Sequence, residues 1–266
     1  MSGSSGPSLA ELLDAAEPAE PRALGGLVGR LEAEGRLRGA WRDGRPTSPI
    51  ALAGLAVRGV AYDSRRAGPG TLFVAVPGAH VDAHDFLPQV AAAGAAAALV
   101  ERPVADVALP QLVVERSQHA LGSAAAWWYG DPSRDLGVVG ITGTDGKTTT
   151  SFLAVAALEA AGLSSGLIGT VQTKVGAVRE ANPEHVTTPE APELQLALRA
   201  MVRAGDRAAV VETTSHGLAL ERVGGIGYDV AILTNLSHEH LEFHGTFEAY
   251  RAAKRSLFER LVTSAA

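Results

Sequence analysis

The stretch VVGITGTDGKTTT, residues 138–150, decides how the second half of the chain folds. Its apolar start is typical of a buried strand over Val138–Ile141, and its end opens a helix predicted over Lys147–Ala161. In the turn between them, backbone N–H groups and the helix N-terminus can bind phosphate oxygens. Lys147 can reach the outer phosphates, and the Thr148 hydroxyl can bind Mg²⁺. The standard phosphate-loop spacing, Gly-x-x-x-x-Gly-Lys, would have glycine at position 141, where this chain has isoleucine. An ordinary glycine-rich turn is therefore the alternative. The Gly-Lys-Thr-Thr that opens the helix favours the phosphate loop.

Strands and helices alternate on both sides of this stretch. Further strands are predicted over Leu72–Val76, Ala97–Val100, Leu112–Val114, Gly166–Thr170, Ala208–Glu212 and Asp229–Leu233. Helices are predicted over Ala83–Ala93, Ser117–Tyr129, Glu190–Ala204 and Phe247–Leu261. This alternation predicts an α/β fold in which a small α/β domain precedes a P-loop domain built on a parallel sheet.

The first 50 residues differ in composition from the rest. Ser8–Glu17 is predicted to be a short amphipathic helix, with Ser8 as its N-cap and Glu11 at the capping-box position. Residues 20–50 are rich in Arg, Gly and Pro, with six arginines and three acids from Arg22 to Arg45. A solvated linker or insertion is favoured there over a functional basic patch. The expected domains are therefore a variable extension over 1–50, a first domain over 51–131 and a second domain over 132–266.

Composition excludes several classes of protein. The 266 residues carry a net charge of −6, which argues against a generally basic nucleic-acid binder. There is no cysteine, so disulfides, thiolate catalysis and cysteine-bound zinc are impossible. The Ala-rich run at 91–100 is too short to span a membrane, and no secretory leader is recognisable. We expect a cytoplasmic protein with neither a nucleic acid nor a membrane as partner.

Two acid- and histidine-bearing segments follow apolar runs. Glu212 ends the run at 208–212, and a carboxylate at the carboxyl end of a parallel strand faces the crevice where ligands bind. It is placed to hold the metal of a Mg-nucleotide, and a helix N-cap or helix-dipole partner is the alternative. Segment SHEHLEFH, residues 237–244, suggests a zinc hydrolase, but HExxH is absent because Glu242 stands four residues after His238. Exposed histidines on a polar turn are a further alternative.

Lysine is scarce in this chain. Only three of the 23 basic residues are lysines, Lys147, Lys174 and Lys254. Lys254 lies on the last predicted helix, where a solvated side chain would be the ordinary interpretation. The scarcity favours a role that an amine can fill and a guanidinium cannot.

Taken together, these motifs resemble the ATP-dependent Mur ligases of peptidoglycan synthesis. The loop TGTDGKTTT (142–150) is similar to the family's ATP loop, which usually has Asn where this chain has Asp145. Segments VTTPE (186–190), ETTSHGL (212–218) and TNLSHEHLEFHGT (234–246) resemble the MurE-type branch. YDSR (62–65) and PGTLFVAVPG (69–78) resemble the uridine-nucleotide-binding domain that the MurE and MurF types share. The resemblance covers residues 55–262.

The resemblance implies an amide ligase. ATP would phosphorylate the free D-Glu carboxylate of UDP-MurNAc-L-Ala-D-Glu, and a diamino acid amine would displace phosphate from the acyl phosphate. ATP and Mg²⁺ are the implied cofactors. The resemblance leaves open whether the diamino acid is meso-diaminopimelate or L-lysine.

The resemblance also assigns roles residue by residue. The ATP loop residues are Gly143, Thr144, Asp145, Gly146, Lys147, Thr148 and Thr149. The residues matching magnesium ligands are Thr148, Glu212, His240 and Lys254, the last as the lysine that is carbamylated in this family. Lys147, Glu212, His240 and Lys254 are the expected catalytic residues. The expected contacts to the UDP-muramoyl substrate come from Ser64, Thr187, Thr188, Thr214 and Arg222.

Two departures from the family pattern bear on these expectations. Asp145 places a carboxylate near the triphosphate. Family members also carry a C-terminal domain with the amino-acid site, so this chain is expected to hold the substrate domain and part of the ATP domain, with little or no ligation by itself. A MurF-type or cyanophycin-synthetase-like ligase and a non-catalytic nucleotide-binding module are the alternatives.

Overall fold

The computed structural model describes residues 6–78, 81–182 and 186–262. The chain forms two compact units, one made of Pro18–Trp128 and the other of Met1–Glu17 with Tyr129–Ala266. We refer to them as the 18–128 unit and the 129–266 unit. This division differs from the expected boundaries at residues 50 and 131, because residues 1–50 are shared between the two units and form no separate extension.

The 129–266 unit contains a six-stranded sheet with the order β12-β11-β10-β13-β9-β14. Its strands are β9 (Gly137–Thr142), β10 (Ser165–Ile168), β11 (Gln172–Val175), β12 (Val178–Ala181), β13 (Ala208–Glu212) and β14 (Val230–Leu233). Strands β10, β13, β9 and β14 run parallel, which confirms the predicted parallel α/β sheet. The β11–β12 hairpin, which was not predicted, extends the sheet in antiparallel fashion.

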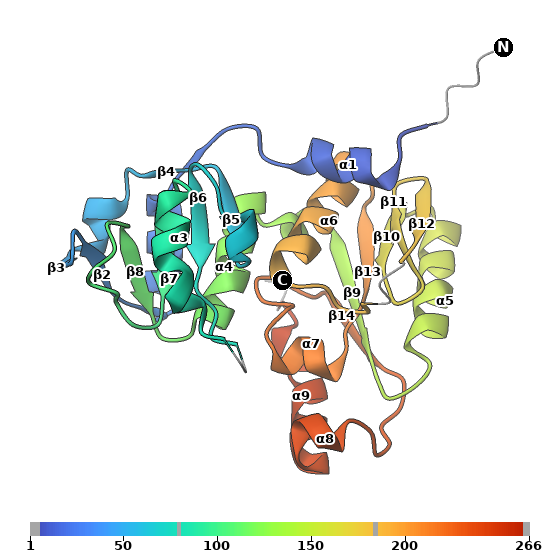
Figure 1. Ribbon diagram of the computed structural model, residues 1–266. Helices are drawn as coiled ribbons and strands as arrows, with labels where there is room; N and C mark the ends of the chain where they lie inside the picture. The colour runs from blue at the N-terminus through green and yellow to red at the C-terminus, as the bar shows by residue number, and fades with distance from the viewer. Residues whose placement is uncertain (1–5, 79–80, 183–185, 263–266) are drawn as a thin grey trace. The chain divides into compact units, whose positions relative to one another are not determined.

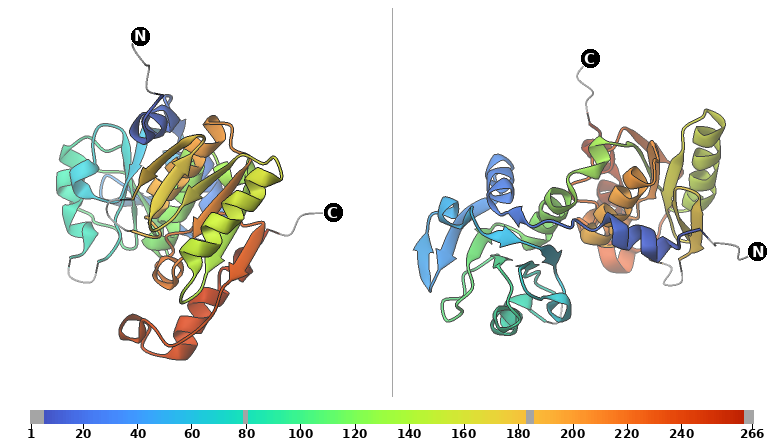
Figure 2. Two further views of the ribbon diagram at one scale, coloured as in Figure 1. Left: turned by 90° about the vertical axis from the view of Figure 1, so that its right-hand side faces the viewer. Right: turned by 90° about the horizontal axis from the view of Figure 1, so that it is seen from above.

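Helices cover both faces of this sheet (Figure 1). The helices of the unit include α5 (Lys147–Ala160), α6 (Ala191–Arg203), α7 (Ser215–Ala219), α8 (Leu241–His244) and α9 (Phe247–Arg255), with short 3₁₀ turns η4 (Pro132–Arg134) and η5 (Phe258–Arg260). Successive side chains of β13 point to opposite faces of the sheet. Val210 packs with Val155 of α5, whereas its neighbours Ala209 and Val211 pack with the core around α6. In Figures 1 and 2, α8 and α9 lie at the end of the sheet where β9 turns into α5.

The N-terminal helix α1 (Leu9–Ala16) belongs to the 129–266 unit. Its predicted N-cap is confirmed: Ser8 and Glu11 form a complete capping box. Leu9, Leu12 and Leu13 pack against the core that includes α6, and the Leu9 N–H donates a hydrogen bond of 2.7 Å to Glu180 on β12. The first helix of the chain is thus attached to the sheet that follows much later in sequence.

The 18–128 unit has its own six-stranded sheet, with the order β3-β2-β8-β7-β6-β5. Its strands are β2 (Leu37–Arg42), β3 (Arg45–Thr47), β5 (Gly59–Ala61), β6 (Thr71–Val74), β7 (Ala97–Val100) and β8 (Gln111–Val114), with a separate pair β1 (Arg22–Ala23) and β4 (Ala56–Val57). Its helical segments are α2 (Gly25–Ala33), α3 (Leu87–Ala92), α4 (Ser117–Tyr129), η1 (Pro49–Leu52), η2 (Ser64–Arg66) and η3 (Ala83–Phe86). The predicted helix over 83–93 therefore begins as a 3₁₀ turn.

The expectation of a solvated linker at 20–50 is wrong. This segment supplies α2, β2 and β3, and β2 pairs with β8. On α2, Leu27, Val28 and Leu31 are buried at the i, i+1 and i+4 spacing of a helix face. The three glycines, Arg30 and Glu32 on the other positions of α2 make this apolar stripe hard to recognise in the sequence.

No helix within the described residues is both long enough and apolar enough to cross a membrane.

Candidate functional site

Two glycines shape the loop between β9 and α5. Gly143 has φ +151°, and a Cβ there would lie 1.8 Å from Thr234 Oγ1, so no side chain fits without displacing the chain after β14. Gly146 has φ +76° and is the residue from which α5 begins. The loop therefore depends on glycine at both positions because one needs space and the other needs a left-handed backbone.

Hydrogen bonds from the segment after β14 hold the loop between β9 and α5 in place. The Asp145 N–H donates to Asn235 Oδ1 at 2.9 Å, and Thr234 Oγ1 donates to the Asp145 carbonyl at 2.6 Å. The Thr144 N–H donates to the Asn235 carbonyl at 3.1 Å. The Asp145 side chain itself is exposed, so its backbone is tied down while its carboxylate stays in water.

Lys147, the first residue of α5, folds back over the loop. Its Nζ donates to the carbonyl of Gly143 at 3.0 Å and to that of Thr144 at 2.7 Å. An anionic ligand in the loop would compete for this ammonium, because charge-assisted bonds to phosphate are stronger than bonds to neutral carbonyls.

Glu212 lies at the carboxyl end of β13, as predicted, and is 1 % exposed. Its Oε2 accepts hydrogen bonds from Thr148 Oγ1 at 3.1 Å and from Thr170 Oγ1 at 2.9 Å. Its Oε1 is buried and has no hydrogen-bond partner within the described part of the chain. Since buried polar atoms are normally paired, this orphaned oxygen needs an explanation.

Glu212 Oε1 lies close against the backbone of Gly169. A Cβ on Gly169 would lie 2.5 Å from this oxygen, so only glycine allows the carboxylate to approach the backbone this closely. Carboxylate and hydroxyl oxygens, here from Glu212 and Thr148, suit Mg²⁺. Among the described residues, no group of three or more histidine or acidic side chains is arranged to bind a metal, so the cation would need phosphate oxygens or water as further ligands.

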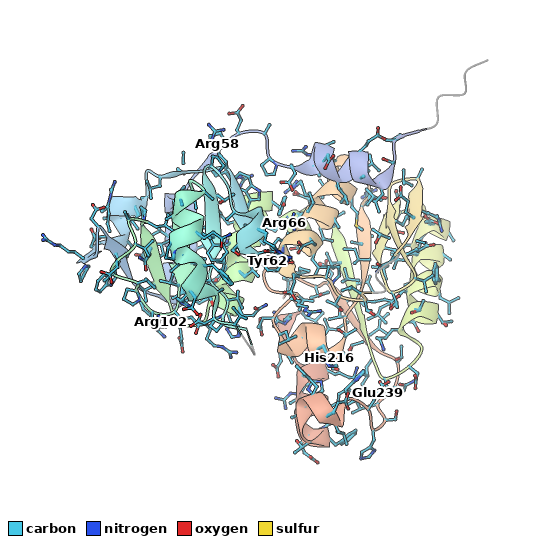
Figure 3. The ribbon with its side chains drawn as sticks, viewed as in Figure 1. Arg58, Tyr62, Arg66, Arg102, His216 and Glu239 are labelled. Carbon is cyan, nitrogen blue, oxygen red and sulfur yellow. The ribbon has the colours of Figure 1, made fainter. Side chains whose placement is uncertain are left out.

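The histidine segment lies at the same end of the sheet. Figure 3 shows His216, from α7, and Glu239, from the segment before α8. The ring of His240 packs edge-on against His216, with centroids 4.7 Å apart, and its two nitrogens lie 3.5–3.6 Å from Glu242 and Glu239. Burial, followed by the neighbouring His240 and Arg222, lowers the pKa of His216. His240 thus faces the cleft.

Lys254 is buried, in contrast to an ordinary solvated lysine. It is 3 % exposed, its Nζ donates to the Gly143 carbonyl at 2.6 Å, and it lies 4.7 Å above the Tyr250 ring. Burial, followed by the charge of Lys147, lowers the pKa of Lys254 to about 8. The two lysines of the motifs therefore share one loop carbonyl, that of Gly143.

A cleft of about 330 Å³ joins most of these residues. It is lined by Thr144, Asp145, Gly146, Lys147, Thr148, Thr149, Thr170, Thr187, Thr214, Glu239 and His240. The structure therefore brings the predicted loop together with two of the predicted substrate residues and His240. Gly143, Glu212 and Lys254 are joined to it through the hydrogen bonds described above.

The remaining predicted substrate residues are engaged in contacts of their own. Thr188 Oγ1 donates to the Glu212 carbonyl at 3.1 Å and lies 3.1 Å from Thr214 Oγ1. Arg222 pairs with Glu190 at 2.7 Å and donates to the Thr188 carbonyl at 3.2 Å. An anionic substrate group would meet an Arg222 that already has a carboxylate partner.

Ser64 lies in the 18–128 unit, at the start of η2. Asp63 caps this turn by accepting from the Arg65 N–H at 2.9 Å and also pairs with the Arg65 guanidinium. These hydrogen bonds lower the pKa of Asp63 to about 2. The cap holds the backbone of the Asp63-Ser64-Arg65 segment in one conformation.

Sequence analysis missed three residues of the site. Thr170 bonds Glu212, Tyr250 OH lies 2.8 Å from Thr144 Oγ1, and Glu239 lines the cleft. Thr170 carried no motif signal, because a threonine after a short strand is common. Glu239 stood inside a quoted motif and Tyr250 in the last predicted helix, but only the fold shows that their side chains reach the cleft and the loop.

The fold and the loop define an α/β protein with a glycine-rich strand-to-helix loop at the carboxyl edge of a parallel sheet. Residues 56–129 match the Mur ligase family catalytic domain, and residues 141–266 match the Mur ligase middle domain. The chain belongs to the Mur ligase family, as its resemblance predicted.

Individual relatives agree with this membership. The chain is 49 % identical over 209 residues to a UDP-N-acetylmuramyl-tripeptide synthetase of Roseiflexus sp. (strain RS-1), covering 77 % of this chain and 41 % of the relative. A solved UDP-N-acetylmuramoyl-L-alanyl-D-glutamate–2,6-diaminopimelate ligase is similar with a TM-score of 0.69 and 28 % identity, over 84 % of this chain and 45 % of that one. The MurF ligase of Thermotoga maritima, solved with ADP, is similar with a TM-score of 0.52 and 26 % identity, over 76 % of this chain and 43 % of that one. The chain thus spans less than half the length of each of these proteins.

Proposed function

We propose that the chain is part of a MurE-type ligase, in which ATP activates the D-Glu carboxylate of UDP-MurNAc-L-Ala-D-Glu as an acyl phosphate and a diamino acid amine then forms the amide. The 18–128 unit would bind the uridine nucleotide, and the 129–266 unit would bind ATP. The similarity to a tripeptide synthetase and to a diaminopimelate ligase supports this substrate class. The proposal places the reaction in the cytoplasm, without nucleic acid or membrane partners.

One observation carries the proposal. Glu212 Oε1 is buried without a hydrogen-bond partner among the described residues, while Oε2 accepts from the Thr148 hydroxyl. Lys147 Nζ donates to two carbonyls of the adjoining loop. This arrangement suits a cation bridged to phosphates better than it suits a purely structural carboxylate. The neighbour solved with ADP supports a nucleotide there.

The residues of this chain would act mainly by binding and orienting. Loop N–H groups and Lys147 would hold the phosphates, and Thr148 with Glu212 would hold Mg²⁺, which when bound screens charge between the carboxylate and the terminal phosphate. His240 and a carbamate on Lys254 would hold a second cation. A carbamate forms on a primary amine and carries negative charge, which explains the use of lysine rather than arginine there.

Nucleotide binding tests the proposal. Calorimetry on the 266-residue chain should show ADP binding that is stronger with Mg²⁺. Lys147→Ala should weaken it about 10- to 100-fold, because a charge-assisted contact contributes roughly 1.5–3 kcal/mol. Arg134→Ala is the matched control, since Arg134 is an exposed cation in η4, at the opposite end of β9. Equal ADP affinity in Lys147→Ala and Arg134→Ala would contradict the assignment of the loop.

The MurF type is the second candidate, because a MurF ligase is among the similar structures. The two types differ in the muramoyl peptide that they take. We expect UDP-MurNAc-dipeptide to bind more tightly than UDP-MurNAc-tripeptide in calorimetry. Tighter binding of the tripeptide would favour the MurF type, and no binding of either would favour a module with another function.

A further inference from the structure

We propose that Thr170 is a positioning residue that holds the Glu212 carboxylate in the rotation in which it lies beside the Thr148 hydroxyl and can bind the cation. This inference rests on the proposed function, since it concerns the metal of the nucleotide site. Thr170 belongs to none of the loop, metal or substrate sets that the sequence indicated.

The two carboxylate oxygens of Glu212 differ in their hydrogen bonds. Oε2 accepts from Thr170 and Thr148, while Oε1 accepts from none of the described residues. A cation that binds the Thr148 hydroxyl oxygen competes with the Thr148–Glu212 bond. The Thr170 bond is then the one that holds the carboxylate in its present rotation.

A second hydroxyl holds Thr170 in turn. Thr187 Oγ1 lies 2.9 Å from Thr170 Oγ1. A hydroxyl has a single proton, and Thr170 donates its own to Glu212, so Thr187 must be the donor in this pair. The order of donation is therefore Thr187 to Thr170 to Glu212, from the cleft wall to the buried carboxylate.

Gly169 allows this orientation because it has no Cβ to collide with the carboxylate. The absent Cβ of Gly169 would fall 2.5 Å from Oε1 and 3.1 Å from the carboxylate carbon. The adjacent residues Gly169 and Thr170 therefore both act on one carboxylate. The glycine lets Oε1 lie close to the backbone, and the threonine hydroxyl holds Oε2. Outer-shell hydrogen bonds of this kind orient metal ligands and tune metal affinity.

The test measures the metal and not turnover. Mn²⁺, which takes the same oxygen ligands as Mg²⁺, is titrated into the chain with saturating ADP, and free Mn²⁺ is followed by electron paramagnetic resonance. Thr170→Val should raise the Kd for Mn²⁺ about 10-fold. ADP affinity measured in EDTA should stay within about twofold, because the loop contacts of the phosphates are untouched.

Three further variants keep the test sharp. Thr170→Ser retains the hydroxyl and should restore Mn²⁺ affinity. Gly169→Ala removes no hydrogen bond, yet it should weaken Mn²⁺ binding because its methyl group would collide with Oε1 and displace the carboxylate. Thr173→Val, in β11, is the control for replacing threonine by valine, and its Kd for Mn²⁺ should equal that of the unsubstituted chain.

Unchanged Mn²⁺ affinity in Thr170→Val, or equal losses in Thr170→Val and Thr170→Ser, would overturn this inference and leave the proposed function standing. An equal loss of ADP affinity in EDTA would also overturn it, since that would place Thr170 in the phosphate site. Failure of the unsubstituted chain to bind Mn²⁺ with ADP would overturn the proposed function, and this inference with it.

Discussion

At the scale of single residues, Lys254 is the clearest case of a side chain whose chemistry is set by its surroundings. Burial to 3 % exposure and the nearby Lys147 both disfavour the ammonium form, which lowers its pKa to about 8. An unperturbed lysine is almost wholly protonated at that pH. The fold therefore supplies the neutral amine that carbamylation would require.

This shift predicts a pH-dependent reaction with CO₂. Near pH 8 about half of the Lys254 amine is neutral, and at pH 6 almost none is. With ¹³CO₂ at constant dissolved concentration, we expect a carbamate signal in ¹³C NMR that grows from pH 6.5 to 8.5. Lys254→Arg should abolish that signal, and its persistence in this variant would assign the carbamate to another amine.

The same shift has a consequence for stability, with a definite sign. The folded-state pKa of Lys254 lies below its unfolded value of 10.5. Between pH 8 and 10.5 the unfolded chain binds more protons, so the contribution of Lys254 to the free energy of unfolding rises with pH. Lys254→Met should flatten this rise in urea unfolding measured at several pH values, and an equally steep rise in the variant would contradict the lowered pKa.

Gly143 gives a second prediction at this scale. Gly143→Ala would place a methyl group 1.8 Å from Thr234 Oγ1, so the chain must shift. We expect a loss of roughly 2–3 kcal/mol in the free energy of unfolding, together with loss of ADP binding. Gly162→Ala is the control, because Gly162 also has positive φ (+79°) but nothing within 4 Å of the added Cβ. Its cost should be about 1 kcal/mol, and equal costs would show that the contact with Thr234 is unimportant.

At the scale of elements, α1 shows how a short helix is stabilised by its place in the fold. Eight residues are too few for a stable isolated helix in water. The capping box satisfies its first N–H groups, and its leucines pack on the core around α6. Local and tertiary interactions therefore favour the same helix boundaries.

Ser8→Ala tests the local part of this stabilisation. Loss of the N-cap should cost about 1 kcal/mol and increase hydrogen exchange in α1. Urea unfolding and amide exchange measure the two effects. Ser48→Ala is the control, because Ser48 precedes η1 without making a side-chain cap bond. If both variants lost the same stability, the capping box would have no specific contribution.

At the scale of the whole molecule, the chain builds two units with separate sheets and passes between them twice, after Glu17 and after Trp128. The residues predicted to bind ATP lie in one unit, and Ser64, predicted to bind the uridine nucleotide, lies in the other. Ligands for the two units should therefore bind through different residues.

This division predicts opposite effects of two substitutions. Ser64→Ala should weaken UDP binding and leave ADP affinity unchanged. Lys147→Ala should weaken ADP binding and leave UDP affinity unchanged. Calorimetry with each nucleotide separates the two effects. Loss of both affinities in either variant, with the fold intact by circular dichroism, would contradict separate sites.

Periodicity and turn chemistry could predict much of this molecule. The apolar runs of β9 and β13, the glycine-rich turn and the Ser8 cap act over a few residues, so neighbouring side chains suffice to predict them. Residues 20–50 were predicted wrongly because α2 is short and its apolar stripe is diluted by arginine and glycine. The β11–β12 hairpin was missed because strand pairing depends on partners that no local pattern specifies.

By itself, the sequence determined the α/β class, the phosphate-loop candidate and Glu212 at the end of its strand, because each depends on residues adjacent along the chain. Only the tertiary structure decided that Thr170 bonds Glu212, that Lys254 is buried on the Gly143 carbonyl and that α1 joins the 129–266 unit. These contacts link residues 42, 111 and 171 positions apart, and their energies exist only once the sheet has brought the segments together.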